Sequence, residues 1–342
     1  MRRFILILFA LGSVSACHAS YEPYAKCELP VSDGKAPLTA RFFGVSTILL
    51  SDGQTAVMTD GFFSRPPASQ FLISKIAPDP TRIDKALAAG GVDNLAALLV
   101  AHSHYDHALD SARVAWKTGA LLVGSESTAI IARGEEFPES RIIVIRGDET
   151  IVLQPFTIAV FESPHSTGTP GEHKRQGTIK APFHSPAHYD DYKEGGSYSF
   201  LIELGGFRTL VHASANFRKG MYDGVRADVV FLGIGTLGKK PDRFVKDYWD
   251  EVVGKTQARL VIPVHWDDFS IALDEKKPLR PASLPIEDFR MAMKMLRPLS
   301  TDKVAMRFMP LFQPVDLMAA AGLPADGPPS VLPSNAPTSS CP

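Results

Sequence analysis

Short apolar runs alternate with helix-like segments between residues 38 and 318. The runs that predict strands are, in chain order, Ala40–Leu50, Gln54–Thr59, Leu95–Ala101, Ala120–Val123, Arg141–Ile145, Thr150–Leu153, Thr157–Phe161, Ser197–Leu204, Phe207–His212, Asp228–Leu232, Arg259–Val264 and Lys303–Phe308. The segments that predict helices are Thr81–Ala89, Ser111–Thr118, Pro241–Gln257 and Ile286–Leu296. Two series of strands, each accompanied by helices, predict an α+β fold with two facing sheets and the helices outside.

The two ends of the chain differ from this body. Arg2 and Arg3 precede apolar residues 4–11 and small residues 12–16, which is the order of a secretory signal peptide, and the apolar run is too short to span a bilayer. Residues 14–17 read Val-Ser-Ala-Cys and resemble the lipobox of bacterial lipoproteins, so we predict a lipidated Cys17; an ordinary cleaved leader is the alternative. Residues 18–37 predict a linker, and residues 319–342, rich in Pro, Ala and Ser, a mobile tail.

Composition and charge are those of an ordinary globular protein. The 342 residues are 45% hydrophobic and 21% charged, and the formal net charge is −1, so no basic excess indicates a nucleic-acid partner. Of the three cysteines, Cys27 and Cys341 remain to pair in an oxidising compartment if Cys17 is lipidated. We expect an exported protein, periplasmic or attached through Cys17 to the periplasmic face of the outer membrane. By resemblance to enterobacterial sorting rules, His18 in place of aspartate favours the outer membrane.

The segment His102-Ser103-His104-Tyr105-Asp106-His107 holds three imidazoles and a carboxylate directly after the predicted strand Leu95–Ala101. Imidazole and carboxylate together suit Zn²⁺ and neighbouring divalent metals. On an extended backbone His102 and His104 project to the same side, whereas Asp106 and His107 need a turn to come together. Four donors on one loop fit two neighbouring metal ions better than one. A solvated loop that happens to be rich in histidine is the alternative.

This hexapeptide resembles the H-x-H-x-D-H motif of metallo-β-lactamase-fold hydrolases. Two later histidines match that family's remaining ligand positions: His165 follows the predicted strand Thr157–Phe161, and His265 follows Arg259–Val264. The resemblance covers about residues 38–312 and is strongest to the branch of L-ascorbate-6-phosphate lactonase and the phospholipase D that acts on N-acyl-phosphatidylethanolamines. It implies an αββα sandwich with two metal sites, formed by His102, His104 and His165 and by Asp106, His107 and His265.

One position departs from the family's pattern. The family places a metal-bridging aspartate in a turn that here spans residues 211–216, and its position falls on Ala215, or on Ser214 with a one-residue shift. Loss of an anionic bridge weakens the occupancy of one site, so we expect one or two Zn²⁺ ions, with Mn²⁺ or Fe²⁺ as alternatives. The third subclass of metallo-β-lactamases also lacks this carboxylate.

Two further residues have candidate roles near the predicted site. His212 ends the strand Phe207–His212, where it either contacts substrate, supports a metal ligand, or is a buried histidine with a structural role. Asp60 follows the strand Gln54–Thr59 and either accepts a hydrogen bond from a metal-binding histidine or serves as a turn residue.

A polar insertion, Gly168–Gly196, separates the two series of strands. It contains His173, His184 and His188, and it predicts either a lid over the site or a solvated loop. We expect the carboxylates of Asp267 and Asp268, which follow His265, to be solvated or to cap a helix.

Together these features predict a metal-dependent hydrolase that cleaves an ester, lactone or phosphodiester-type bond in a small-molecule or lipid-like substrate. Asp106 would bind the second metal and orient the hydroxide, and His265, His212 or a lid residue would stabilise the oxyanion. The alternatives are a β-lactam hydrolase of the type without a bridging aspartate and a non-catalytic metal-binding lipoprotein. A di-iron redox enzyme is disfavoured because no flavodoxin-sized segment follows.

Overall fold

The structure is a computed structural model that describes residues 20–180, 182–283 and 287–323. The predicted leader with Cys17 and most of the predicted tail, including Cys341, lie outside these residues. Cys27 is buried and disulfide-bonded, and its pairing with Cys341 stays a prediction because neither of the other two cysteines is described. Among the described residues, the helices are too short or too polar to cross a membrane.

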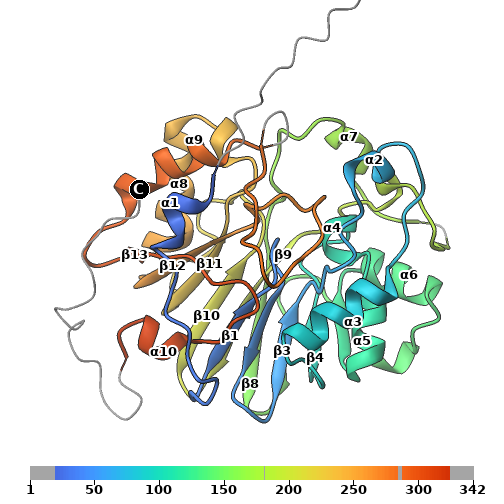
Figure 1. The fold of residues 1–342 in the computed structure, drawn as a ribbon, viewed down its shortest axis with the longest axis horizontal. Helices are drawn as coiled ribbons and strands as arrows, with labels where there is room; N and C mark the ends of the chain where they lie inside the picture. The colour runs from blue at the N-terminus through green and yellow to red at the C-terminus, as the bar shows by residue number, and fades with distance from the viewer. Residues whose placement is uncertain (1–19, 181, 284–286, 324–342) are drawn as a thin grey trace, which may run out of the picture.

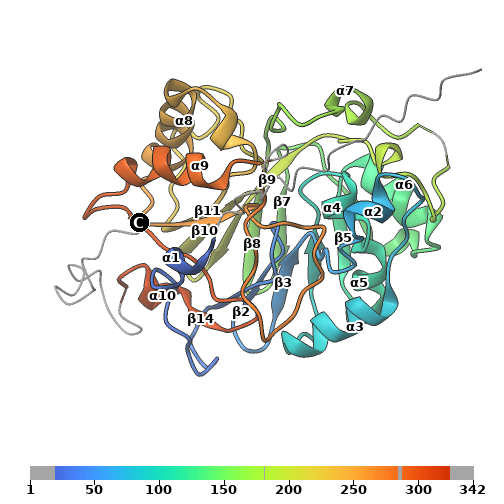
Figure 2. The same ribbon diagram turned by 45° about the horizontal axis from the view of Figure 1, so that its top comes forward.

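Two mixed sheets of seven strands face each other, with helices outside both, which confirms the predicted αββα sandwich (Figures 1 and 2). In order across the first sheet, the strands are β14 (Val315–Asp316), β1 (Thr39–Phe42), β2 (Ile48–Ser51), β3 (Ala56–Thr59), β4 (Ala97–Leu99), β5 (Leu121–Gly124) and β6 (Ile142–Val144). In order across the second sheet, they are β13 (Ala305–Met306), β12 (Leu260–Val264), β11 (Val229–Gly233), β10 (Phe207–His212), β9 (Tyr198–Leu204), β8 (Phe156–Glu162) and β7 (Thr150–Leu153).

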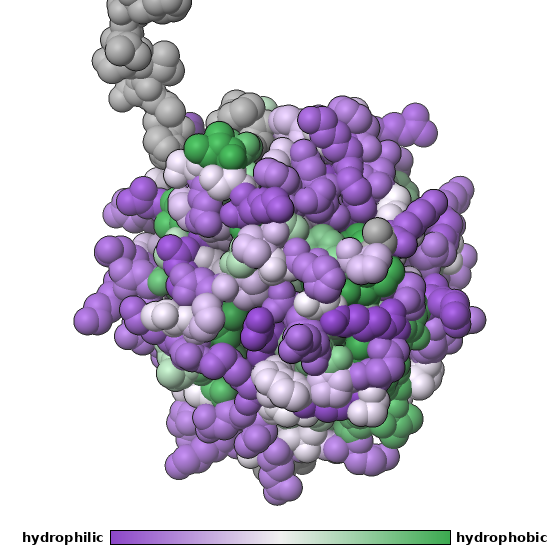
Figure 3. Space-filling model, turned by 90° about the vertical axis from the view of Figure 1, so that its right-hand side faces the viewer, coloured by the Kyte–Doolittle hydropathy of each residue, from purple (hydrophilic) through white to green (hydrophobic). Residues whose placement is uncertain are grey.

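The helices lie in two groups, one against each sheet. The α-helices are α1 (Glu22–Ala25), α2 (Ala68–Phe71), α3 (Pro80–Ala89), α4 (Tyr105–Ala108), α5 (Ser111–Thr118), α6 (Glu126–Gly134), α7 (Glu172–Arg175), α8 (Asp242–Trp249), α9 (Phe289–Leu296) and α10 (Leu317–Ala320). The short helical turns are η1 (Glu139–Arg141), η2 (Tyr189–Asp191), η3 (Leu237–Lys239), η4 (Asp250–Gly254) and η5 (Arg297–Leu299). The side that carries α3, α5 and α6 is mostly hydrophilic, with apolar residues in separate patches (Figure 3).

The first sheet is buried on both faces, so its strands are continuous apolar runs without alternation. In β4, Ala97 and Leu99 belong to the core between the sheets, whereas Leu98 belongs to the core under the outer helices, together with Ile83 of α3 and Val114 of α5. Successive side chains of a strand point to opposite faces, which explains this division.

Three segments differ from the sequence predictions. The run Ala40–Leu50 is two antiparallel strands, β1 and β2, because Gly44 and Val45 have positive φ angles (86° and 49°) and reverse the chain inside the apolar run. The predicted helix Pro241–Gln257 ends as α8 at Trp249 and continues as the π-helical turn η4. Within the predicted strand Lys303–Phe308, only β13 pairs in the sheet.

The described part of the predicted linker, residues 20–37, packs in part against the body. Tyr21 and Tyr24, which flank the start of α1, are buried, and the Tyr21 ring stacks on Trp266 with centroids 4.7 Å apart. Tyr24 lies edge-on to Phe289. Aromatic side chains of this size add stabilising contacts when they are buried together.

Both sheets direct the carboxyl ends of several strands toward one region. Strands β3 to β6 run parallel, as do β10 to β13, and β8 has the direction of β10 because both are antiparallel to β9. Asp60 follows β3, His102 lies just beyond β4, His165 beyond β8, and His265 directly follows β12. Side chains after strand ends are held by rigid neighbours, which suits a functional site.

Candidate metal centre

The hexapeptide folds as an extended segment followed by one helical turn. His104 is the extended residue before α4, and α4 supplies the turn that brings Asp106 and His107 to the same side. All four donor residues, His102, His104, Asp106 and His107, are buried. The local geometry therefore orients all four donors of this segment inward.

A first group consists of His102, His104 and His165. One ring nitrogen from each lies within 4.8 Å of the others. The centroids of the His104 and His165 rings are 4.6 Å apart, and the two ring planes are nearly perpendicular. His104 Nε2 donates to the Arg175 carbonyl oxygen at 3.3 Å, which leaves Nδ1 with a free lone pair.

A second group consists of Asp106, His107 and His265, whose donor atoms also lie within 4.8 Å of one another. Asp106 Oδ2 is 3.3 Å from His265 Nε2 and 3.6 Å from His107 Nε2. The two groups adjoin, because the rings of His102 and His107 have centroids 3.8 Å apart. This arrangement suits two neighbouring ions, as expected from four donors on one loop.

The donors fit a metal in both protonation and hydrogen bonding. Burial and neighbouring histidines hold the pKa values of His102 and His165 well below the usual range, and burial lowers that of His104 to about 4, so these rings are neutral ligands at neutral pH. His102 Nδ1 and His107 Nε2 are buried without a hydrogen-bond partner in the described chain. Such unpaired atoms are costly, and ligation of a metal would satisfy them.

The second group attracts positive charge. Burial raises the pKa of Asp106, but His107 and His265 outweigh it and keep that pKa well below its usual range. Burial lowers the pKa of His265, and the hydrogen bond and charge of Asp106 reverse this and raise it to about 9. The ionised Asp106 therefore favours a cation in this group, whether an imidazolium or a metal ion.

Asp60 holds His107 from behind, as one of its two predicted roles requires. Its Oδ2 accepts from His107 Nδ1 at 2.9 Å and from Ser46 Oγ at 2.5 Å, and its Oδ1 accepts from the Ala101 backbone at 2.8 Å. The proton of the ring is thereby fixed on Nδ1, and Nε2 faces the second group. Because Asp60 is fully buried, this orientation is firmly held.

We expect Asp60→Asn to weaken binding of the ion at the second group by about 10- to 100-fold, because an asparagine amide competes as a donor with His107 Nδ1–H. Titration of Zn²⁺ against a chromogenic chelator measures this affinity. Asp110→Asn is the matched control, since Asp110 is a buried carboxylate that accepts from the Phe63 and Ser64 backbones and is not a member of either group. Equal affinities in the two variants would contradict the prediction.

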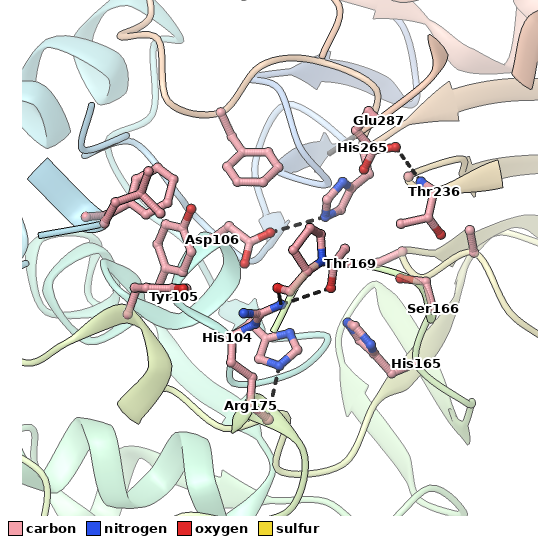
Figure 4. A pocket seen from close by; sticks show the side chains of 18 residues that line it. His104, Tyr105, Asp106, His165, Ser166, Thr169, Arg175, Thr236, His265 and Glu287 are labelled. Atoms are coloured by element: carbon pink, nitrogen blue, oxygen red, sulfur yellow. Dashed lines mark hydrogen bonds and ion pairs between the residues drawn. The ribbon is translucent and has the colours of Figure 1, made fainter. Parts of the chain in front are cut away.

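A cavity of about 310 Å³ opens over both groups (Figure 4). Its lining is mainly apolar, with a few charged and polar side chains. The aromatic lining residues are Phe71, Tyr105, Tyr189 and Phe269. An apolar cavity with a few convergent polar groups is typical of a small-molecule site.

The polar insertion forms part of this cavity. Arg175 and Tyr189 line it, and the Arg175 guanidinium, nine-tenths buried, donates to Thr169 Oγ1 at 2.9 Å and lies 3.4 Å from Asp190 Oδ1. The histidines at 173, 184 and 188 are not among the lining residues. The insertion therefore contributes Arg175 and Tyr189 to the wall of the site, and its role as a lid stays a prediction.

Of the three roles considered for His212, its position fits the structural one and does not fit direct contact with substrate. It is fully buried and does not line the cavity. Its Nδ1 is 2.8 Å from both Ser199 Oγ and Tyr222 Oη, and its Nε2 donates to the Asn216 carbonyl. Asn216 Nδ2 in turn donates to the His165 carbonyl at 2.7 Å, so His212 steadies the turn behind His165.

The turn at residues 213–216 brings no carboxylate to the site. Ala215 is buried and lines the cavity, where the family's bridging aspartate was expected. Ser214 Oγ accepts from the Ser166 backbone at 3.0 Å. Neither position can supply a negatively charged bridge.

Two carboxylates near His265 were not predicted correctly. Asp267 is buried, not solvated: its Oδ2 is 2.6 Å from Arg65 Nη2, and its Oδ1 accepts from the Val45 backbone at 2.7 Å. Glu287 was missed, yet it lines the cavity beside His265, and burial raises its pKa to about 7 despite the His265 charge. No local pattern distinguishes Glu287 from a surface glutamate near the start of a helix.

The chain is similar to known metal-dependent proteins. No family model matches it. It is 22% identical over 275 residues to a UPF0173 metal-dependent hydrolase of Myxococcus xanthus, covering 77% of this chain and 83% of that protein. It is 24% identical over 245 residues to a protein of the same description from Heliobacterium modesticaldum, covering 68% and 84%. The structure of Igni18, a metallo hydrolase of Ignicoccus hospitalis, has a similar fold, with a TM-score of 0.51, 15% identity, and coverage of 81% of this chain and 97% of that one.

Proposed function

We propose that this chain is a zinc-dependent hydrolase of the metallo-β-lactamase superfamily that cleaves an ester, lactone or phosphodiester-type bond. Its similarity to metal-dependent hydrolases supports the proposal. The observation that carries the proposal is the pair of adjoining three-ligand groups at the base of one cavity. His₃ and Asp-His₂ donor sets suit Zn²⁺. When bound, a divalent metal polarises the scissile carbonyl or phosphoryl oxygen and lowers the pKa of water to about 7.

The chain's own groups perform the remaining steps. Asp106, which is ionised, would accept a hydrogen bond from the attacking water and orient it. Arg175 presents a guanidinium at the cavity wall, where it stabilises negative charge that develops on the substrate. Arg175, which lies in the insertion, thus takes the role for which His265, His212 and a lid residue were the candidates.

The lining supports an apolar or lipid-like substrate. Phe71 and Tyr105 lie on one wall, with ring centroids 5.5 Å apart. Leu72 lines the cavity while 62% exposed, and its neighbour Ile73 is 81% exposed, so apolar surface continues from the cavity to the outside. Exposed apolar side chains beside a cavity are suited to binding apolar ligands.

One observation favours a second candidate, β-lactam hydrolysis. Ala215 replaces the bridging carboxylate, and the third subclass of metallo-β-lactamases, to which this chain bears a resemblance in its ligand set, also lacks it. The two candidates share their metal groups and differ only in the bond that is cleaved.

The test combines metal content with an activity panel. Protein purified without chelator is expected to contain one or two zinc ions by elemental analysis, and to hydrolyse one of four chromogenic substrates, an ester, a lactone, a phosphodiester or a cephalosporin. Removal of the metal by a chelator is expected to abolish turnover, and Zn²⁺ to restore it. Metal without turnover on all four substrates would favour the non-catalytic alternative, and turnover that survives full metal removal would overturn the proposal.

A further inference from the structure

His265 is held in a conformation that leaves one of its two ring nitrogens, Nδ1, without a hydrogen-bond partner among the described residues. It has a φ of 58°, and its backbone N–H donates to the Val45 carbonyl at 2.6 Å. Its Nε2 faces Asp106, whereas its Nδ1 is buried without a hydrogen-bond partner in the described part of the chain. A neutral imidazole that ligates through Nε2 carries its proton on Nδ1, so this atom requires an acceptor.

Glu287 is the carboxylate on that side of the ring. It is 6% exposed, and one of its oxygens, Oε2, accepts from the Thr236 backbone. Figure 4 shows Glu287 and Asp106 on opposite sides of His265. Glu287 is therefore not placed to substitute for the absent bridging carboxylate between the two groups.

Gly235 keeps open the space between the two side chains. A Cβ atom at residue 235 would lie 2.9 Å from His265 Nδ1 and 3.2 Å from Glu287 Oε1. Gly235 is not among the glycines with positive φ, so its backbone does not require glycine. The lack of a side chain at this position matters because it leaves Nδ1 and Oε1 facing one shared space.

We propose that Glu287 is a positioning residue that accepts the Nδ1 proton of His265 across this space and directs Nε2 toward the second metal group. This inference rests on the proposed metal site. It gives His265 the same kind of support that Asp60 gives His107, so that both histidines of the second group are oriented by a carboxylate. Such support matters most in a group without a bridging carboxylate.

Two substitutions test the proposal through metal affinity. Glu287→Gln replaces the carboxylate acceptor with a neutral amide. Gly235→Ala fills the space between the two side chains and leaves Glu287 itself unchanged. Both variants are expected to weaken binding of the ion at the second group by about 10- to 100-fold and to leave the affinity of the first group for its ion unchanged. Competition with a chromogenic chelator measures the two affinities.

Glu251→Gln is the matched control. Glu251 is a 4% exposed glutamate that also accepts a backbone hydrogen bond, from Gly220 at 2.9 Å, and it does not line the cavity. Its substitution is expected to change thermal stability but not the affinity of either ion. A second readout is the imidazole N–H resonance of His265 in zinc-loaded, ¹⁵N-histidine-labelled protein, which Glu287→Gln is expected to shift or broaden.

The outcomes separate the inference from the proposed function. If the wild type binds two ions and both variants bind the second ion equally well, Glu287 only holds the Thr236 turn and the inference is wrong. If the His265 resonance is unchanged in Glu287→Gln, the inference is also wrong. If the wild type binds no ion at the Asp106 group, the proposed site fails, and the inference fails with it.

Discussion

Asp106→Asn is expected to lower turnover by more than about 100-fold and to remove the ion bound at the second group. Asp106 is the only carboxylate among the six candidate ligands, and Ala215 offers no replacement. The substitution leaves this group without negative charge and replaces the carboxylate that orients the attacking water with a neutral amide, a weaker acceptor and a poor metal ligand. Because loss of an outer-shell partner alone costs 10- to 100-fold, loss of a charged ligand costs at least the upper value. Steady-state kinetics and metal analysis of the same preparation measure both effects.

His104→Ala is a second variant that is expected to lose activity, and Asp268→Asn is a control. His104→Ala is expected to abolish retention of the first ion and turnover as well. Asp268 lies close to His265 in sequence, but its Oδ1 accepts from Ser270 within the same loop and its carboxylate belongs to neither ligand group, so Asp268→Asn is expected to keep wild-type turnover. Hydrolysis that persists in a metal-free His104→Ala/Asp106→Ala double variant would rule out the metal-dependent mechanism.

Asp267→Ala is expected to lower the free energy of unfolding by about 3–5 kcal/mol, because it leaves the Arg65 guanidinium buried without its partner. Both side chains are fully buried, and their closest atoms are 2.6 Å apart. Asp267 also accepts from the Val45 backbone, whose carbonyl in turn accepts from His265. Loss of Asp267 therefore loosens the loop that holds a candidate ligand. Urea unfolding monitored by circular dichroism measures the change.

The control for this prediction is an exposed ion pair. Glu203 and Arg208 are 2.7 Å apart, with side chains 37% and 41% exposed, so Glu203→Gln is expected to cost at most about 1 kcal/mol. The prediction would fail if Asp267→Ala cost no more than this.

The candidate ligands could be named from sequence because four of them lie within six residues. His102 and His104 share a side of an extended segment, and one turn of helix suffices to bring Asp106 and His107 together. His165 and His265 were candidates because each follows a predicted strand, as the hexapeptide does, and only the family resemblance assigned each of them to a group. The structure brings all six side chains into two adjoining groups.

The sequence predictions were wrong or undecided where hydrophobicity does not show where the chain turns or which way a side chain faces. Both faces of the first sheet are buried, so Ala40–Leu50 has no alternation that would mark a chain reversal, and Gly44 was the only local sign of one. The role of His212 could not be decided for a related reason. A histidine at a strand end can face either the cavity or the core, and only its contacts with Ser199 and Tyr222 show that it faces the core.

The sequence by itself determined the sandwich fold and the donor-rich hexapeptide, because apolar runs and closely spaced ligands are local features. Only the tertiary structure decided what supports the donors. Arg65 and Asp267 meet across 202 residues, and Glu287 comes to face His265 through a space that Gly235 keeps open. These partners come from elements that the packing of two sheets brings together, and a charged residue destined for such a buried contact has no local signal that distinguishes it from one at the surface.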